Sequence, residues 1–188
     1  MARDELYGVF LRAECSGKRA LLVPGPIGSG KTRAVGLLAQ TLRERGYAVA
    51  GVLSPRVLVG AETVGYLVQD LCTGKSLPLC AASSDRAVLA SLFPGNEPNG
   101  EVFRFRRFFF FPKSLAFANA ALEKAAREAE VIVVDEVGPL ELSGEGLAPG
   151  LGACLKSPAV LILTVRPHLL LEVQRLLGLR EPEILRLP

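Results

Sequence analysis

The sequence predicts an α/β fold in which a doubly wound, mostly parallel sheet is flanked by helices and carries a small antiparallel hairpin. Two observations predict this class. Apolar runs of strand length, such as residues 159–165, alternate with segments whose apolar residues recur at helical spacing. Residues 131–134 are four consecutive β-branched apolar residues, as a strand buried on both faces requires. The 188 residues suit one domain with a sizeable core.

The first part of the chain reads as leader, strand, helix and strand. Residues 1–18 are a mixed leader that precedes the predicted first strand at 19–23. A helix is predicted from Thr32 to the residue before Gly46, because four apolar residues share one helical stripe: Val35, Leu38, Ala39 and Leu42. Residues 47–53 form the predicted second strand, which Ser54 and Pro55 end.

The middle of the chain has shorter pieces. Residues 56–80 are β-prone and broken by a turn at 72–75, which predicts an antiparallel hairpin inserted after the second strand. Residues 81–101 are predicted to be a loop, because Pro, Gly and Asn cluster at 94–100. Residues 103–111 contain six Phe and three Arg. We interpret this run as partly buried β-structure. Two alternatives are an aromatic and basic surface that stacks on nucleic-acid bases, and a single Phe or Arg of the run that contacts the nucleobase of the bound nucleotide.

The last part alternates again between helix and strand. Ser114 is the expected N-cap of an alanine-rich helix over 115–130. The strand at 131–134 follows, then a loop at 143–150 and a short helix towards Lys156. The strand at 159–165, a helix over 168–177 and a final strand at 184–187 complete the prediction.

Composition restricts the class of protein. A net charge of +3 gives little support for binding nucleic acid. The four cysteines form no C-x-x-C pair, and one histidine cannot complete a zinc site, so we expect reduced thiols and a cytoplasmic location. No apolar run approaches the ~20 residues of a membrane span, so no membrane contact is expected.

The strongest motif is Gly25-Pro26-Ile27-Gly28-Ser29-Gly30-Lys31-Thr32, which matches the phosphate-binding pattern G-x-x-x-x-G-K-[ST] between a strand and a helix. Its glycines let backbone N–H groups turn towards phosphate oxygens, and the following helix adds partial positive charge. Lys31 is expected to reach the β- and γ-phosphates, and the hydroxyl of Thr32 to bind Mg²⁺. Arg33 comes directly after this loop and is a further candidate phosphate contact.

Two carboxylates follow the buried strand at 131–134. Ligands of open α/β sheets bind at the carboxyl ends of the strands. Asp135 is therefore expected to hold Mg²⁺, and Glu136 to position or deprotonate the attacking water. Arg56 is our preferred candidate for stabilising charge on the transferring phosphoryl group, ahead of Arg33 and Arg166.

The chain resembles the THEP1 family of nucleoside-triphosphatases. Four segments carry the resemblance: the loop 25–32, Gly51-Val52-Leu53-Ser54-Pro55-Arg56-Val57, Asp135-Glu136-Val137-Gly138-Pro139-Leu140-Glu141-Leu142, and the strand 159–165. It implies a P-loop NTPase fold and Mg²⁺-dependent hydrolysis of several nucleoside triphosphates with a loose base preference. It assigns roles to Lys31, Thr32, Asp135 and Glu136. The leader 1–18 and the run 103–111 depart from the family pattern.

Two other functions stay open at this stage. In a nucleotide or metabolite kinase, Arg104, Arg106 and Arg107 would cover the donor, and transfer would need an acceptor hydroxyl. A nucleotide-dependent adaptor would bind nucleic acid through the same arginines. The sequence contains no N-K-x-D segment, so a guanine-specific switch is not indicated. It gives no oligomeric state.

Overall fold

Five parallel strands form the half of the sheet that carries the nucleotide-binding motifs. The computed structural model describes residues 2–187. In spatial order the five strands are β10 (Glu183–Ile184), β1 (Ala20–Pro24), β9 (Val160–Val165), β8 (Val131–Val137) and β2 (Val49–Leu53). Every residue of β1 and β2 is buried, which explains their continuous apolar sequence. The prediction of a doubly wound, mostly parallel sheet is confirmed.

Antiparallel strands extend the same sheet beyond β2. They are β4 (Glu62–Asp70), β5 (Ser76–Ala81), β7 (Phe108–Phe110) and β6 (Phe103–Phe105), and β3 (Arg56–Val59) pairs with β4. The expected hairpin is therefore continuous with the main sheet. The interpretation of residues 103–111 as β-structure is confirmed, because Phe103, Phe108 and Phe110 pack against the main core.

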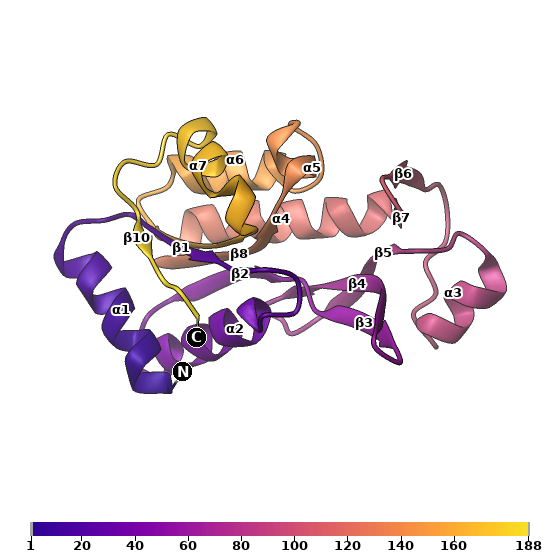
Figure 1. The fold of residues 1–188 in the computed structure, drawn as a ribbon, viewed down its shortest axis with the longest axis horizontal. Coiled ribbons are helices and arrows are strands. Elements are labelled where there is room, and N and C mark those ends of the chain that lie inside the picture. Colours follow the sequence, from indigo (N-terminus) through magenta and orange to yellow (C-terminus); the bar gives the residue numbers. More distant parts are fainter. Residues whose placement is uncertain (1, 188) are drawn as a thin grey trace.

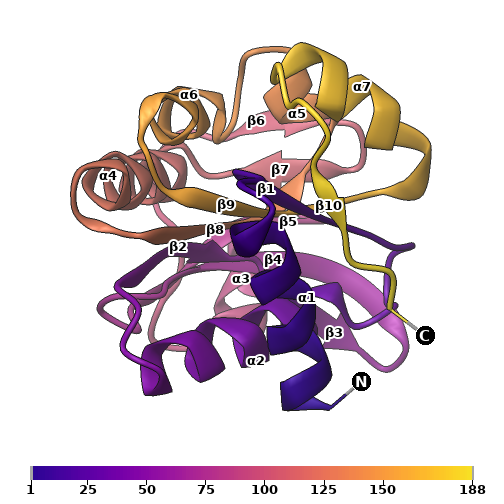
Figure 2. The ribbon, with the colours of Figure 1, turned by 90° about the vertical axis from the view of Figure 1, so that its left-hand side faces the viewer.

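Helices cover both faces of the sheet. Figure 2 shows α1 (Arg3–Cys15) and α2 (Lys31–Glu44) on one face, and α4 (Pro112–Glu128), α6 (Ala148–Lys156) and α7 (Leu170–Leu176) on the other. The short helix α5 (Pro139–Leu142) and a 3-10 turn (Pro167–Leu169) follow β8 and β9. In Figure 1, α3 (Arg86–Leu92) lies at the end of the molecule remote from α1. No helix within residues 2–187 is long and apolar enough to cross a membrane.

The helical stripe predicted after the phosphate-binding loop is confirmed. Val35, Leu38, Ala39 and Leu42 are all buried, and they pack with Leu6, Val9 and Phe10 of α1. The leader 1–18 therefore contains a helix that completes one layer of the core. Burial of these side chains stabilises the layer, since each buried Val, Leu or Phe side chain contributes on the order of 1.5–3 kcal/mol.

Three sequence predictions are wrong in detail. Residues 81–101 are not all loop, because the Asp85 carboxylate accepts hydrogen bonds from the N–H groups of Ala87 and Val88 and begins α3. Ser114 is buried within α4 and does not cap it; Pro112 occupies the first helical turn, where its missing N–H costs nothing. The last strand covers Glu183–Ile184 only.

Candidate functional site

The loop between β1 and α2 has the backbone that its glycines permit. Gly28 and Gly30 have φ angles of +86° and +84°, and Gly30 is the N-cap of α2. A Cβ atom at Gly25 would lie 2.5 Å from Oγ of Ser29 and 3.2 Å from Cγ of Lys31, so a larger residue there would displace these two side chains. The Oγ atom of Ser29 is buried and has no hydrogen-bond partner among the described residues. A phosphate oxygen is a group that would satisfy it.

Lys31 lies inside this loop. Its side chain is almost fully buried, and its Nζ atom donates hydrogen bonds to the carbonyl oxygens of Gly25 (2.8 Å) and Pro26 (2.9 Å). The same Nζ lies 3.6 Å from Oε1 of Glu136. The ammonium group thus joins the loop to the end of β8, and the motifs at 25–32 and 135–136 meet at one point.

Asp135 occupies the face of β8 that α2 covers. Val131 and Val133 pack with the α2 core, and strand alternation places Asp135 on their side. The residue is fully buried. Its Oδ2 atom accepts a hydrogen bond from the N–H of Ser54 (3.0 Å), and Oδ1 accepts one from the Thr164 hydroxyl (2.6 Å). These two donors fix the carboxylate while leaving it further lone pairs.

Glu136 interrupts the strand. It has a φ of +67°, which is rare for a residue with a Cβ, and the pairing of β8 with β9 shifts register between Val134 and Val137. The N–H of Glu136 donates to Oγ1 of Thr164 (2.7 Å), which holds this unusual turn. Strained backbone of this kind concentrates at functional sites.

The three candidate arginines differ in position. The guanidinium of Arg56 lies beside the loop, because a Cβ at Gly28 would be 3.5 Å from its Nη1 atom. The Nε atom of Arg166 lies 3.9 Å from Oε2 of Glu136; it is buried and has no hydrogen-bond partner among the described residues. Arg33 is exposed on the first turn of α2. The structure therefore brings Arg56 and Arg166 to the site and leaves Arg33 at the surface.

Glu141 organises the turn after β8. Its Oε2 atom accepts a hydrogen bond from the N–H of Gly138 (2.9 Å), and Oε1 accepts one from Leu147 (3.3 Å). Burial raises the pKa of this carboxyl to about 6. The side chain therefore acts as an acceptor that holds α5 against the start of α6.

A cavity of about 400 Å³ opens beside the two carboxylates. Asp135, Glu136, Glu141 and Arg166 are among the residues that line it. Most of its other lining residues are apolar and come from β4, β5, α4, α5 and the β6–β7 hairpin; they include Tyr66, Leu79, Phe108, Phe110, Leu115 and Leu140. Arg106 and Arg107 also line the cavity. Burial raises the pKa of the Tyr66 hydroxyl, and the nearby Glu136 carboxylate adds to this shift.

Thr164 and Ser54 are site residues that sequence reasoning did not identify. Both contact Asp135 from neighbouring strands, β9 and the end of β2. A signal was present for Thr164, since it is a polar residue in an otherwise apolar strand. Thr164 and Ser54 both reach Asp135 because β9 and β2 are the two neighbours of β8 in the sheet, an order that the sequence does not reveal.

Comparison with known proteins places the chain among its relatives. A family model described as NTPase matches residues 20–186. The chain belongs to this family. The Nucleoside-triphosphatase THEP1 of Thermofilum pendens is 31% identical over 77% of this chain and 71% of the relative. The protein of the same name from Methanothermobacter thermautotrophicus is 30% identical over 82% of this chain and 80% of the relative.

Two solved structures share the fold. The solution structure of a human cancer-related nucleoside triphosphatase has a TM-score of 0.64 and 22% identity, and the alignment covers 90% of this chain and 88% of that one. The crystal structure of THEP1 from Aquifex aeolicus has a TM-score of 0.60 and 20% identity, with 89% of each chain covered. The resemblance to a P-loop NTPase of the THEP1 type, drawn from four sequence segments, is confirmed.

Proposed function

We propose that this protein hydrolyses nucleoside triphosphates to the diphosphate and phosphate, with Mg²⁺ and with a broad base preference. One observation carries the proposal: Lys31, Asp135 and Glu136 meet at the carboxyl ends of β1 and β8. Family membership supports the same reaction, because the relatives are named nucleoside-triphosphatases.

The loop 25–32 supplies the phosphate site. The backbone N–H groups of its glycine-rich turn and of the start of α2 favour an anion beside Lys31. The Lys31 ammonium exchanges its two carbonyl partners, Gly25 and Pro26, for β- and γ-phosphate oxygens. The phosphate oxygens carry negative charge, whereas the carbonyl oxygens are neutral, so the ammonium group is attracted more strongly to the phosphates.

Thr32 and Asp135 are the residues that would hold Mg²⁺. Hydroxyl and carboxylate oxygens are hard ligands, and Mg²⁺ is commonly bound by one or two carboxylates together with substrate phosphates. Within residues 2–187 there is no cluster of three or more His, Cys, Asp or Glu side chains that could hold a metal alone, which accords with a metal shared with the substrate. When bound, the ion would neutralise charge on the phosphates.

Glu136 is the proposed water-positioning residue. Its carboxylate accepts the proton of the attacking water as the oxygen–phosphorus bond forms. The bond from the γ-phosphorus to the bridging oxygen breaks, and the diphosphate leaves with that electron pair. Arg56 and Arg166 flank the loop and Glu136, and their positive charges would stabilise the charge that develops on the phosphoryl group. Arg33 would contact phosphate only from the edge of the site, since it is exposed.

We also propose that the chain works in the cytoplasm. All four cysteines are free, and Cys15 and Cys72 are exposed. Exposed unpaired thiols suit a reducing compartment.

Phosphate release from ATP, GTP, CTP and UTP with Mg²⁺ and without any acceptor tests the proposed reaction. Glu136→Gln should lower kcat by about 100-fold or more and leave nucleotide binding intact. Lys31→Ala should weaken binding itself. Glu145→Gln removes an exposed carboxylate of the loop before α6 and should match wild type. Release that requires an added acceptor would instead establish a kinase, and full turnover by Glu136→Gln would remove that residue from the mechanism.

A further inference from the structure

The proposed hydrolysis leaves most of the cavity beside Glu136 without a role. Hydrolysis requires one water molecule at the Glu136 carboxylate, whereas the cavity measures about 400 Å³. Sites for small organic ligands are typically about 300–1,000 Å³, are mostly apolar and have a few polar groups that set the orientation. The cavity has this size and this composition.

The cavity lies on the side from which the nucleophile attacks. In phosphoryl transfer the attacking and leaving oxygens lie on opposite sides of the phosphorus. Glu136 marks the attacking side, so the leaving diphosphate, with its ribose and base, extends the other way. Of the loop 25–32, Ile27 lines the cavity, whereas Lys31 and Thr32 are not among its lining residues in the described part of the chain. With Asp135 and Glu136 in its lining, the cavity borders the γ-phosphate end of the proposed nucleotide site, opposite the leaving diphosphate and its nucleobase.

The walls suit a planar ring. Phe108 packs edge-to-face on Tyr66, with ring centroids 5.6 Å apart, and Phe110 stacks on Phe103, also at 5.6 Å. Phe108 and Phe110 remain only half-buried. The Arg107 guanidinium lies over the Phe108 ring, 4.7 Å from its centroid. Because Phe108 and Phe110 both line the cavity and are only partly buried, a further aromatic ring would contact them there.

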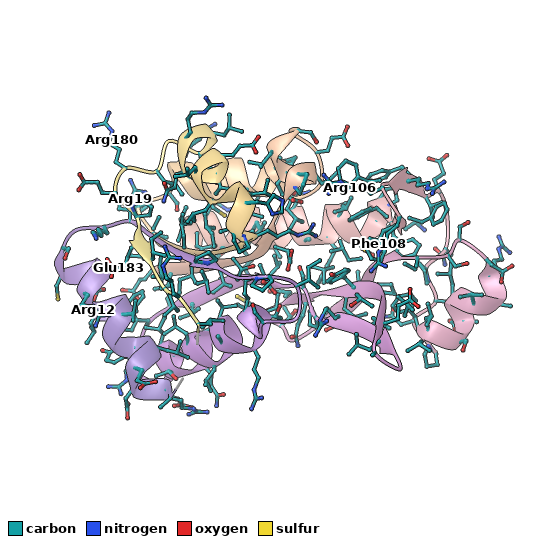
Figure 3. The ribbon with its side chains drawn as sticks, in the orientation of Figure 1. Arg12, Arg19, Arg106, Phe108, Arg180 and Glu183 are labelled. Carbon is teal, nitrogen blue, oxygen red and sulfur yellow. The ribbon has the colours of Figure 1, made fainter. Side chains whose placement is uncertain are left out.

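The charged residues that line the cavity set the orientation of the ligand. Arg106 lies in the turn of the β6–β7 hairpin, with a φ of +55°, and forms no ion pair with a carboxylate of residues 2–187. Arg107, in contrast, donates to the carbonyl oxygen of Thr63. The third lining arginine, Arg166, lies 3.9 Å from Oε2 of Glu136, so its charge is offset by that carboxylate. Arg106 is therefore the lining cation that an anionic group of the ligand would contact. Figure 3 shows Arg106 and Phe108 together on this hairpin, at the opposite end of the sheet from Glu183.

We propose that the cavity binds a planar aromatic acid, a small molecule with an unsaturated ring system and one anionic group, and that this ligand inhibits hydrolysis. Its ring lies among Tyr66, Phe108 and Phe110, and its anion contacts Arg106. A ligand in this position covers the water side of Glu136. The inhibition rests on the proposed function, because it requires Glu136 to be the residue that positions water; the binding does not.

Binding is tested directly with 8-anilinonaphthalene-1-sulfonate, a fluorescent aromatic sulfonate, titrated into the full chain. Wild type should bind it and enhance its fluorescence. Arg106→Asn removes the charge while keeping a residue that tolerates positive φ, and should weaken binding by about tenfold. Arg86→Asn is the control, since Arg86 is exposed on α3, forms no ion pair within residues 2–187 and is not among the cavity's lining residues in that range. If all three proteins bind the sulfonate with equal affinity, or if both variants lose affinity equally, the proposed site is wrong.

Kinetics then tests the inhibition. The sulfonate should lower kcat for triphosphate hydrolysis without raising KM, and Arg106→Asn should need a higher concentration for the same effect while keeping normal hydrolysis in its absence. A rise in KM at constant kcat would place the probe in the nucleotide site and overturn the proposal. Unchanged hydrolysis with the probe bound would overturn the inhibition. If Glu136→Gln keeps full turnover, the proposed function fails, and the fluorescence titration still decides the binding site.

Discussion

At the scale of single residues, Thr164 connects the carboxylate of Asp135 to the backbone of Glu136 in the candidate site. Its hydroxyl donates to Oδ1 of Asp135 at 2.6 Å and accepts the N–H of Glu136 at 2.7 Å. Because both Thr164 and Asp135 are fully buried, neither bond can be replaced by bulk water. One hydroxyl thus fixes the direction of the proposed metal ligand and the left-handed backbone of the proposed water-positioning residue.

Thr164→Val tests this connection, because valine has nearly the shape of threonine and lacks its hydroxyl. A buried carboxylate oxygen and a backbone N–H lose their partner, so the free energy of unfolding should fall by about 1–3 kcal/mol. The kcat for hydrolysis should fall more than nucleotide affinity, since the displaced group is Glu136. Thr164→Ser, which keeps the hydroxyl, should stay close to wild type in both measurements. A Thr164→Val protein with wild-type stability and kcat would contradict the role.

The residues that the sequence predicted for the site are those in local motifs. The run 25–32 and the pair Asp135–Glu136 each lie within a few positions of a strand end, so spacing alone places them at the carboxyl edge of the sheet. Thr164, Ser54 and the cavity walls come from separate strands that meet only in the folded sheet. No local pattern encodes which strands become neighbours, and for this reason they were not predicted.

At the scale of secondary-structure elements, the short helix α5 depends on one carboxylate. Glu141 accepts hydrogen bonds from Gly138 and Leu147, at the two ends of the turn that carries Leu140 into the cavity wall. Burial raises the pKa of Glu141 from 4.5 to about 6. The folded state therefore favours the protonated Glu141 side chain more than the unfolded chain does, and ionisation of Glu141 lowers the free energy of unfolding.

The sign of the resulting pH dependence follows from this shift. A raised carboxyl pKa adds stability below pH 4.5, and this contribution is lost as the pH rises through about 6. The stability of wild type relative to Glu141→Gln should therefore fall by about 2 kcal/mol at most between pH 4 and pH 7, as measured by urea unfolding. Glu145→Gln, which changes an exposed carboxylate nearby, should show no such trend. A constant difference for Glu141→Gln across this range would contradict the shift.

Elements were predictable where one strong pattern covers them. Strands β8 and β9 have continuous apolar runs, and helix α2 has apolar residues at helical spacing. All three exist at the expected places. Helix α3 has only seven residues, and its start depends on the Asp85 side chain. Because this signal is short and the Pro and Gly residues at 94–100 indicate a loop, the sequence predicted a loop for the whole segment. Strand β10 consists of two residues that pair with β1, which lies near the other end of the sequence. A local pattern does not reveal such a distant partner.

At the scale of the whole molecule, the two faces of the sheet contribute to different parts of the candidate site. Figure 2 shows α1 and α2 on one face of the sheet and α4, α5 and α6 on the other. The loop 25–32 begins α2, whereas most cavity-lining residues belong to the core under α4 and α6, and Asp135 and Ile27 line the cavity as well. Glu136 lies at the register shift of β8 between Val134 and Val137. The proposed nucleotide site and the proposed second ligand therefore meet at the carboxyl end of β8.

This division predicts that α1 contributes stability and does not take part in catalysis. Phe10 is completely buried between α1 and the α2 core and packs edge-to-face on Tyr47 at 5.4 Å, at the end of the molecule remote from the cavity. Phe10→Ala removes a large buried side chain and should lower the free energy of unfolding by about 3–5 kcal/mol. At a temperature where the variant is still folded, its kcat and KM should equal those of wild type. Leu171→Ala, at a position 77% exposed, should change stability by less than about 0.5 kcal/mol. If Phe10→Ala instead lowers kcat in the folded state, the leader helix reaches the reaction through the α2 core, and the separation of the two faces is wrong.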